Sequence, residues 1–458
     1  MRILLLTKYV DHFNYVRSIA EELLKQGAQV TVWFTKRRSF DDLEADGEEL
    51  KAFQKKYPHF KFGYSKNRVG FMKKPLFVIR GFLNYRRYLV VSGQSPFYRE
   101  RMLKHMPFYV ESLFVHFRAF MDAILRPKIS NRFLAWIQSV VPSDKGIAKS
   151  IQDECFNVVV GMLGNMQLSA PDVEYIKAAK SLGVPSVFLL KSWDSMTNKG
   201  YLYEVPDRIF VWNEAHKHDA QSHHGVDPAI VTVVGAPIFD MWYEPAIPFE
   251  NREESKKALG LDSAQMIILY LGSSPSSASD DRFIVEGLRK VMDSSQNNII
   301  REALLLVRPH PSNSDMYRDF EMNGVVVMPK NPTAPGTKET QLLALRQFRA
   351  SSVAIGVNTS AMFEAMVQKT PVISYLVPAF SETQSEAEHF RELEESGAVA
   401  LVRSDEEALL EFEKIANGKD EQAEARERFL RETLRPRGVN LRVGKIVADE
   451  IIALAKSR

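Results

Sequence analysis

Residues 1 to 34, MRILLLTKYVDHFNYVRSIAEELLKQGAQVTVWF, contain the pattern that decides the fold. An apolar run at 2–10 is followed by a segment, 14–27, with apolar residues spaced as on one helical face and Gly27 as its stop. A second apolar run, 28–34, completes the unit. A strand, a helix and a strand in this order predict a βαβ unit, and therefore a parallel sheet.

The same alternation continues along the chain. Further strands are predicted at 156–163, 185–193, 208–213 and 230–237, and a second series begins at 266 with strands at 266–274, 303–310, 324–329, 351–358 and 371–376. Helices are predicted near 281–293, 315–321, 338–348, 359–367, 384–396 and 405–416, with a terminal amphipathic helix at 442–457. The polar, proline-bearing stretch 243–262 resembles a linker. We therefore predict an α/β fold of two Rossmann-like parallel-sheet domains that face a cleft. Their bounds are 1–245, with a helical insert at 66–140, and 246–432, followed by a C-terminal helix at 433–458.

The bulk composition limits the class of protein. A chain of 458 residues is too long for one compact core, and its formal net charge is only +3. One cysteine, Cys155, excludes disulfide bonds within the chain and favours a reducing cytoplasm. The N-terminus lacks the pattern of a signal peptide, and no window of about 18 apolar residues is present. We expect a cytoplasmic protein.

Ligands of parallel sheets bind at the carboxyl ends of the strands, so the strand exits of the second domain are candidate sites. Arg308 and His310 leave an apolar strand in the motif RPHP and suit phosphate oxygens. Small or hydroxyl-bearing residues follow two other strands, and a carboxylate that suits ribose hydroxyls lies one turn further on. The predicted ligand-binding residues, called the donor-binding residues below, are thus Arg308, His310, Gly272, Ser273, Ser274, Asn358, Thr359, Ser360 and Glu364.

These three loops together describe a cradle for a nucleotide. The Walker motif G-x-x-x-x-G-K-[ST] is absent, and neither half opens with G-x-G-x-x-G. The sequence therefore gives little support to an ATPase or an NAD-dependent dehydrogenase.

The motif RPHP followed by NTS, 358–360, is similar to the His-Pro and Ser/Thr-Ser motifs of bacterial sialyltransferases, polysialyltransferases and Kdo transferases. The chain thus resembles glycosyltransferases of the GT-B fold. The resemblance implies that His310, Thr359 and Ser360 contact the phosphate of a nucleotide-activated sugar. CDP-glycerol glycerophosphotransferases and UDP-GlcNAc 2-epimerase-like proteins share related patterns, so the nucleotide stays open.

The first domain offers candidates for the acceptor side. The segment that starts at His12 resembles the start of UDP-dependent glycosyltransferases, whose histidine is the general base, although Tyr15 replaces their proline. Asp11 is a rival base, and Asp194, at another strand exit, is a third. Lys191, Trp193 and Asn165 are predicted acceptor-binding residues.

Metal ions are not expected to take part. The histidine-rich segment 216–225 lacks a cysteine and an H-E-x-x-H motif, and it favours a surface helix. No D-x-D motif occurs, which argues against a metal-dependent GT-A transferase. We predict no metal and no cofactor other than the activated sugar as substrate.

The segment 66–104 holds ten Lys or Arg residues against one acid, with seven aromatic residues between them. Such a segment suits an anionic membrane surface, or it is a solvated helical face over a local core. No nucleic-acid module is recognisable.

We predict a glycosyltransferase of bacterial surface polysaccharide synthesis, such as capsule or lipopolysaccharide, which transfers a sugar to a glycan or lipid-linked acceptor. It contacts the inner membrane face through 66–104. The alternatives are a CDP-glycerol-type glycerophosphotransferase, a UDP-GlcNAc 2-epimerase-like enzyme and a non-catalytic nucleotide-sugar-binding protein.

Overall fold

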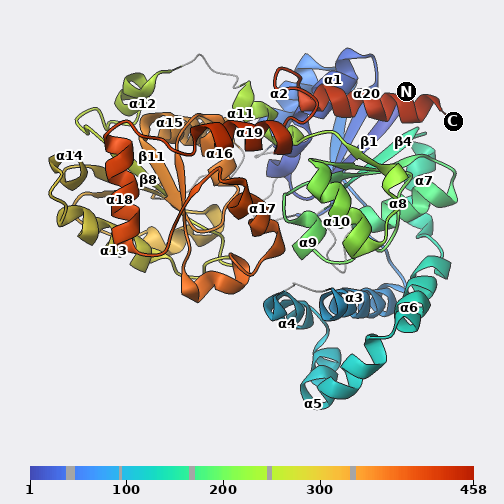
Figure 1. Ribbon diagram of the computed structural model, residues 1–458. Helices are drawn as coiled ribbons and strands as arrows, with labels where there is room; N and C mark the ends of the chain where they lie inside the picture. Colours follow the sequence, from blue (N-terminus) through green and yellow to red (C-terminus); the bar gives the residue numbers. More distant parts are fainter. Residues whose placement is uncertain (38–46, 92–94, 164–170, 245–249, 331–336, 458) are drawn as a thin grey trace. The chain divides into compact units, whose positions relative to one another are not determined.

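The computed structural model describes residues 1–37, 47–91, 95–163, 171–244, 250–330 and 337–457 (Figure 1). The chain forms two compact units, one of residues 1–238 with 433–458 and one of residues 239–432. Each unit has its own parallel sheet and its own hydrophobic core.

The sheet of the first unit has seven strands in the order β3-β2-β1-β4-β5-β6-β7, and every neighbouring pair is parallel. The central strand is continuously apolar, as expected for a parallel sheet covered on both faces, and Ile3 pairs with Val30 and Val158. The strands are β1 (Arg2–Thr7), β2 (Gln29–Phe34), β3 (Phe60–Tyr64), β4 (Val158–Leu163), β5 (Ser186–Leu190), β6 (Arg208–Val211) and β7 (Val231–Val233).

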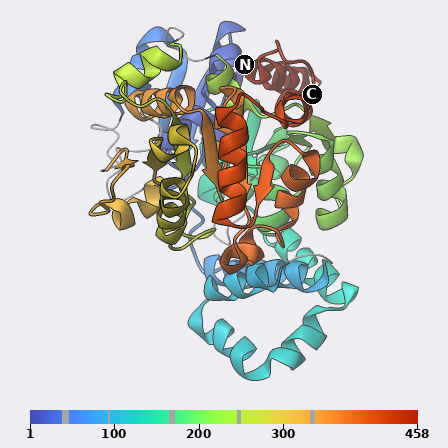
Figure 2. The same ribbon diagram turned by 60° about the vertical axis from the view of Figure 1, so that its left-hand side comes forward.

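Eleven helices of the described residues belong to this unit. They are α1 (Arg17–Lys25), α2 (Glu48–Lys56), α3 (Lys73–Val90), α4 (Pro96–Lys104), α5 (Phe108–Leu125), α6 (Lys128–Val140), α7 (Lys145–Asp153), α8 (Pro171–Ser181), α9 (Ser195–Asn198), α10 (Glu214–His224) and α20 (Val443–Lys456). Apolar residues of α1, α2 and α20 pack on β1 and β2 in one core. Figure 2 shows α3 to α6 as a separate helical layer beside the sheet.

The C-terminal helix α20 packs along α1. Arg442 at its start forms ion pairs of 2.7 Å with Glu21 and 2.9 Å with Glu22. A Cβ atom at Gly444 would lie 2.5 Å from Ser18 Oγ, so only glycine permits this approach of the two helices. The end of the chain is therefore part of the first unit.

The sheet of the second unit has six parallel strands in the order β10-β9-β8-β11-β12-β13. Helices α13 and α18 lie side by side over one face, where their apolar residues join the core (Figure 1). The strands are β8 (Ile267–Leu271), β9 (Leu304–Arg308), β10 (Val325–Val327), β11 (Val353–Gly356), β12 (Val372–Tyr375) and β13 (Ala400–Val402). The helices are α11 (Asp240–Tyr243), α12 (Arg252–Ala258), α13 (Arg282–Asp293), α14 (Asn298–Arg301), α15 (Lys338–Ala350), α16 (Ala361–Val367), α17 (Glu388–Ser396), α18 (Asp405–Ala416) and α19 (Ala423–Thr433).

Some elements differ from the sequence prediction. The helix predicted at 315–321 is a 3-10 segment, Pro311–Tyr317, because His310 caps its start and Pro311 fixes its first residue. Strands β3 and β13 and helix α19 were not predicted. The two strands have only five and three residues, which is too short for a clear hydrophobic period.

Candidate functional site

The second sheet changes its direction of growth between β8 and β11. The chain runs outward from β8 through β9 to β10 and then crosses to β11, on the other side of β8. Open parallel sheets bind ligands at the carboxyl ends of the strands beside such a switch point. The three loops predicted to bind a donor follow β8, β9 and β11, which are neighbours, so the structure brings them to one edge of the sheet.

Two glycines allow these loops to approach one another closely. A Cβ atom at Gly272 would lie 2.9 Å from His310 N, and one at Gly356 would lie 2.9 Å from Leu271 O. The amide of Gly272 also donates to Arg308 O at 2.9 Å. A larger residue at either position would push the strand exits apart, so Gly272 sets the spacing of the candidate site.

His310 is oriented by its own loop. Its Nδ1 accepts a hydrogen bond of 3.1 Å from the amide of Ser312, which assigns the ring hydrogen to Nε2. Burial and, to a smaller extent, the positive charge of Arg308 lower the pKa of His310 to about 4. At neutral pH the ring is therefore uncharged, and Nε2–H is available as a hydrogen-bond donor.

Arg308 and Glu364 are electrostatically coupled beside this ring. Burial lowers the pKa of Arg308 and raises the pKa of Glu364 to about 7, while each charge favours the ionised form of the other. Arg308 Nη1 donates to Gln347 Oε1 at 2.9 Å, which fixes one side of the guanidinium. Near neutral pH, Glu364 can thus either donate or accept a hydrogen bond.

In the loop after β11, one polar side chain holds the loop in place and another is accessible to a ligand. Asn358 is buried, and its Nδ2 donates to Thr383 O at 2.5 Å, so this side chain holds the loop. Thr359 Oγ1 accepts a 3.4 Å bond from the amide of Ala361. Ser360 is exposed at the start of α16 and makes no capping bond with its side chain. Of the three, Ser360 is therefore the residue that is most accessible to a ligand.

The serine loop after β8 is fixed by a hydrogen bond to the carboxylate of Asp281, which was not predicted from the sequence. Ser273 is buried, and its amide donates to Asp281 Oδ2 at 3.2 Å. Asp281 Oδ1 accepts a 2.7 Å bond from Tyr317 Oη. Ser274 is partly exposed and lies within 2.9 Å of Ser276 Oγ. The pair Asp281 and Tyr317 joins residues far apart in sequence, so no local motif could have indicated it.

In the first unit the sheet changes direction between β1 and β4. The loop after β1 forms a 3-10 turn, Val10–Tyr15, that carries both Asp11 and His12. His12 Nδ1 lies 3.1 Å from Lys191 Nζ, which follows β5. The structure thus brings together a predicted base and a predicted acceptor-binding residue.

Lys191 has an unusual environment for an amine. Burial, together with the charges of Lys8 and Lys199, lowers its pKa to about 7, although Asp11 opposes the shift. Its ammonium lies 4.9 Å from the ring centroid of Tyr15, which also packs on His12. At neutral pH, Lys191 is therefore close to half protonated.

The other acceptor-side candidates are placed differently. Asp194 accepts a 2.6 Å bond from Ser192 Oγ and forms a 2.8 Å ion pair with Lys199, so it is held in its own turn. The side chain of Trp193 is only 6% exposed, which leaves little of its ring for stacking on a sugar. Asn165 lies outside the described residues.

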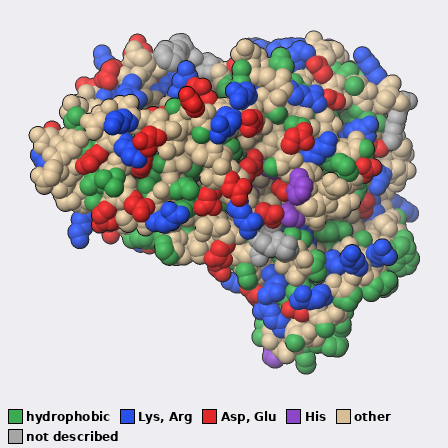
Figure 3. Space-filling model, viewed as in Figure 1, with side chains coloured by type: hydrophobic (Ala, Val, Ile, Leu, Met, Phe, Trp, Pro, Cys, Tyr) green, Lys and Arg blue, Asp and Glu red, His purple; other side chains and the backbone are tan. Residues whose placement is uncertain are grey.

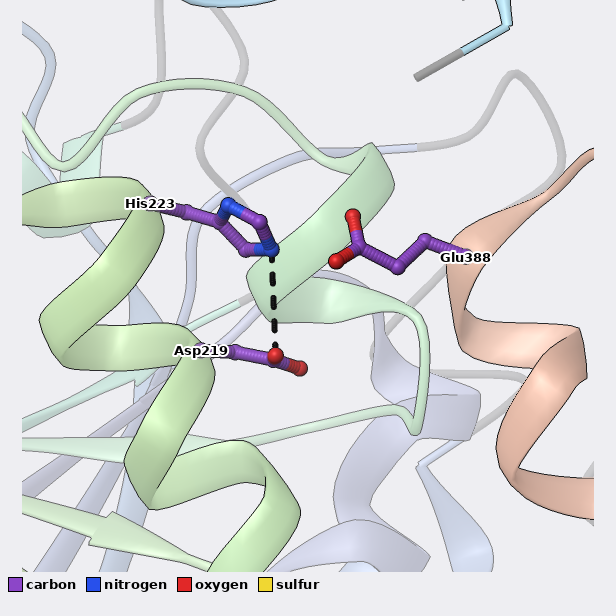
Figure 4. A group of neighbouring side chains, drawn as sticks. All are labelled: Asp219, His223 and Glu388. Atoms are coloured by element: carbon purple, nitrogen blue, oxygen red, sulfur yellow. Dashed lines mark ion pairs between the residues drawn. The ribbon is translucent and has the colours of Figure 1, made fainter. Parts of the chain in front are cut away.

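The histidine-rich helix α10 is less exposed than predicted. His216 is 1% exposed and its Nε2 lies 2.9 Å from Trp193 O, while His224 Nε2 lies 2.9 Å from Met196 O. Both rings bind the loop after β5, so the prediction of a plain surface helix was wrong for these two. His223 Nε2 is 3.7 Å from Asp219 Oδ1 (Figure 4). The absence of a catalytic metal stays a prediction.

A basic pocket of about 550 Å³ lies at the ends of β2 and β3. It is lined by aromatic side chains and by more cations than acids. The cations are Lys36, Arg37, Arg68, Lys73 and Arg80, and the acid is Glu174. Arg68 and Arg80 both bond to Glu174, so one carboxylate is shared between two guanidinium groups. The pocket was missed because its residues come from three separate segments.

The basic segment 66–104 is only partly a surface. Arg80, Arg86 and Arg87 are buried, at 3%, 8% and 2% exposure. Arg87 donates to Met196 O and Arg86 to Arg126 O, at 2.6 and 3.2 Å. Much of the predicted positive patch therefore serves to hold the helical layer on the unit.

No protein-family model matches the chain, and a search of curated proteins finds no match. Solved structures do match over nearly the whole chain. The UDP-GlcNAc 2-epimerase of Methanocaldococcus jannaschii is 14% identical with a TM-score of 0.52, covering 99% of this chain and 100% of its own. A glycosyltransferase from Rickettsia africae is 11% identical with a TM-score of 0.52, and 98% of each chain is covered.

A third match is UGT71G1 of Medicago truncatula, complexed with UDP-glucose. It is 12% identical with a TM-score of 0.53, covering 99% of this chain and 98% of its own. These similarities, together with the two parallel sheets, show that the chain has the GT-B fold, as predicted from the sequence.

Proposed function

We propose that this protein is a glycosyltransferase. It moves a sugar from a nucleotide-activated donor to a glycan or lipid-linked acceptor, in the synthesis of a bacterial surface polysaccharide. The observation that carries the proposal is the convergence of Arg308, His310 and the glycine-spaced loop at Gly272 on the switch point of the second sheet. The similar structures include one that is complexed with UDP-glucose, which supports a nucleotide-sugar donor.

On the donor side, the chemistry needed is stabilisation of the departing phosphate. Negative charge develops on that group as the glycosidic bond to the nucleotide breaks, and fixed donors favour the transition state. Arg308 supplies a positive charge, and the uncharged His310 supplies a directed N–H. The exposed Ser360 and the partly exposed Ser274 offer hydroxyls for the remaining oxygens, and Glu364 suits the ribose hydroxyls.

On the acceptor side, a base must take the proton of the attacking hydroxyl. His12 fits when Lys191 is uncharged, because the ring can then donate from Nδ1 to the amine and keep the Nε2 lone pair for the acceptor. Asp11 and Asp194 remain the alternative bases. No metal is required by this scheme, so EDTA should leave turnover unchanged.

The basic pocket in the first unit suggests the chemistry of the acceptor. Its volume of about 550 Å³ suits a sugar-sized group. The excess of cations favours a phosphate or carboxylate, and Phe34, Tyr64 and Phe77 provide apolar walls for a sugar ring. We therefore favour an acceptor that carries an anionic group, such as a sugar phosphate of a lipid-linked glycan.

A thermal-shift panel with CMP, CDP, UDP, GDP and dTDP tests the donor site. A nucleotide at about 100 times its Kd stabilises by about 2.7 kcal/mol, a rise of roughly 2–4 °C for each kcal/mol. His310→Ala should reduce the shift to about half, whereas a substitution of exposed Lys330 should keep it. No shift with any nucleotide on folded protein would exclude the proposal.

Two related enzymes and one binding protein remain as alternatives. A UDP-GlcNAc 2-epimerase-like enzyme is favoured by the similar epimerase structure and would convert its substrate without an acceptor. A glycerophosphotransferase would respond to CDP-glycerol. A non-catalytic nucleotide-sugar-binding protein would show a thermal shift but no turnover. Product analysis with and without acceptor separates these outcomes.

A further inference from the structure

Helices α5 and α6 of the first unit carry an unusual density of exposed apolar side chains. Among the described residues, twenty large hydrophobic side chains are exposed, and eleven of them lie within residues 108–140. Figure 3 shows hydrophobic side chains gathered over this part of the unit. We call this set the α5–α6 apolar face. Its members are Phe108, Tyr109, Leu113, Val115, Phe117, Phe120, Ile124, Ile129, Phe133, Trp136 and Val140.

The exposure is too large to be ordinary surface. Phe108 is 83% exposed, Val115 is 72% exposed and Ile129 is 69% exposed. Single exposed apolar residues are common on soluble proteins, but a contiguous group of this size marks an interaction site.

The two helices are firmly attached on their other sides, so the face is not the result of a missing core. Tyr85 Oη of α3 donates to Asp122 Oδ1 at 2.6 Å, and its ring lies 4.3 Å from that of Phe114. Arg80 Nε donates to Gln138 Oε1 of α6 at 3.0 Å. Helix α3 therefore fixes α5 and α6 through their polar and buried residues and leaves the apolar ones outward.

Charge around the face favours an anionic partner. Residues 66–140 contain fourteen Lys or Arg residues and three acids, and the cations outnumber the acids even without the buried Arg80, Arg86 and Arg87. Two of the acids are occupied, since Asp122 accepts from Tyr85 and Glu100 pairs with Arg118. Three exposed cations lie between and within the two helices, at Arg126, Lys128 and Arg132.

The combination of exposed aromatic side chains with flanking cations is typical of segments that lie in a membrane interface. Within the described residues, no helix is long and apolar enough to cross a bilayer. We propose that the α5–α6 apolar face inserts into the surface of an anionic lipid bilayer, with both helices in the plane of the interface. This places the docking element at 108–140 rather than at 66–104, and it stands apart from the proposed transfer reaction.

Co-sedimentation of the full chain with vesicles tests this proposal. Vesicles of phosphatidylethanolamine and phosphatidylglycerol should bind the wild type. Phe133→Ser with Trp136→Ser should weaken binding by on the order of tenfold for each side chain removed. Replacing Arg126, Lys128 and Arg132 by Gln should weaken it by about fivefold for each charge, and high salt should do the same.

The matched control changes two exposed apolar residues of the second unit, Phe283→Ser and Leu410→Ser, which should leave vesicle binding intact. Circular dichroism melting verifies the fold of every variant. In addition, brominated lipid should quench the fluorescence of Trp136, and Trp136→Phe should lose that component.

The proposal would be overturned if the wild-type protein did not bind these vesicles. It would also be overturned if the folded variant Phe133→Ser with Trp136→Ser, the aromatic variant, bound them as the wild type does. A concentration-dependent dimer that the aromatic variant abolishes, without vesicle binding, would instead assign the face to a second copy of the chain. None of these measurements uses a nucleotide, so their failure leaves the proposed transferase reaction untouched.

Discussion

His12 Nδ1 lies 3.1 Å from Lys191 Nζ, although the two residues are 179 positions apart in the sequence. One follows β1 and the other follows β5, and the sheet brings their loops together. Because burial and two neighbouring ammonium groups lower the pKa of Lys191 to about 7, the amine loses its proton near neutral pH and can then accept a hydrogen bond from His12 Nδ1. The pair therefore links the protonation of one side chain to the basicity of the other.

We predict that turnover rises with pH through about 7, since His12 can accept the acceptor's proton at Nε2 only when Lys191 is uncharged and accepts from Nδ1. Lys191→Met should lower kcat by on the order of a hundredfold, the low end for loss of general base catalysis. Lys199→Met removes one of the charges that depress the pKa of Lys191, so it should keep activity but move the midpoint upward. Initial rates across pH 5.5–9 check this.

An unchanged midpoint in Lys199→Met, with normal activity, would show that Lys191 does not control the base. Full activity in Lys191→Met would contradict the role of the His12–Lys191 pair and would favour Asp11 or Asp194 as the general base.

The same lysine should affect stability. Its pKa is about 7 in the folded protein and 10.5 ordinarily, so between these values the unfolded chain binds more protons than the folded one. Stability from this group therefore rises as pH increases from 7 to 10.5. Lys191→Met removes the dependence, so its melting temperature should exceed that of the wild type most at pH 7 and by little near pH 10.5. Melting curves at both pH values measure this. A variant that is less stable at pH 7 contradicts it.

His310 should act as an uncharged donor rather than as a cation. Because burial and Arg308 lower its pKa to about 4, the ratio of wild-type to His310→Ala nucleotide affinity should be constant from pH 8 down to about 5. The ratio separates the ring from Glu364, whose pKa is about 7. His310→Ala should weaken binding by about tenfold, the value of one hydrogen bond to a charged group. His310→Gln, which keeps an N–H, should recover part of the loss. Isothermal titration calorimetry with the responding nucleotide gives these affinities. A ratio that increases steeply between pH 7 and pH 6 would indicate a charged ring.

The basic pocket at the ends of β2 and β3 should determine acceptor affinity only. Arg37→Gln with Lys73→Gln should raise KM for an anionic acceptor by about tenfold and leave kcat and nucleotide binding unchanged. Lys55→Gln with Lys145→Gln, two exposed changes outside the pocket, serves as the charge-matched control. Equal effects of the two pairs would mean that general surface charge, and not the pocket, attracts the acceptor.

The local sequence was sufficient for both parallel sheets apart from the short strands β3 and β13, because continuous apolar runs and polar strand exits are short-range signals. It placed Arg308 and His310 on the correct strand end. It could not indicate that Asp281 and Tyr317 hold the serine loop, or that Lys36, Arg68 and Glu174 meet in one pocket, since these contacts join distant segments. It also overestimated the exposure of Trp193 and His216, because a polar neighbourhood in sequence does not determine burial.

Glu364, in the second unit, should also make the stability of the protein depend on pH. Its pKa is about 7 against an ordinary 4.5, because burial disfavours the carboxylate and Arg308 compensates only in part. Between these values the folded protein binds more protons than the unfolded chain, so stability from this group falls as pH rises from 4.5 to 7. Glu364→Gln should therefore melt above the wild type at pH 8, by roughly 2–4 °C for each kcal/mol recovered, and equal it near pH 4.5. Arg308→Gln should have the opposite effect, since the carboxylate then loses its cation. Melting curves of both variants at the two pH values measure these effects. A Glu364→Gln variant that is less stable than the wild type at pH 8 would contradict the prediction, because it would show that the fold needs the ionised carboxylate.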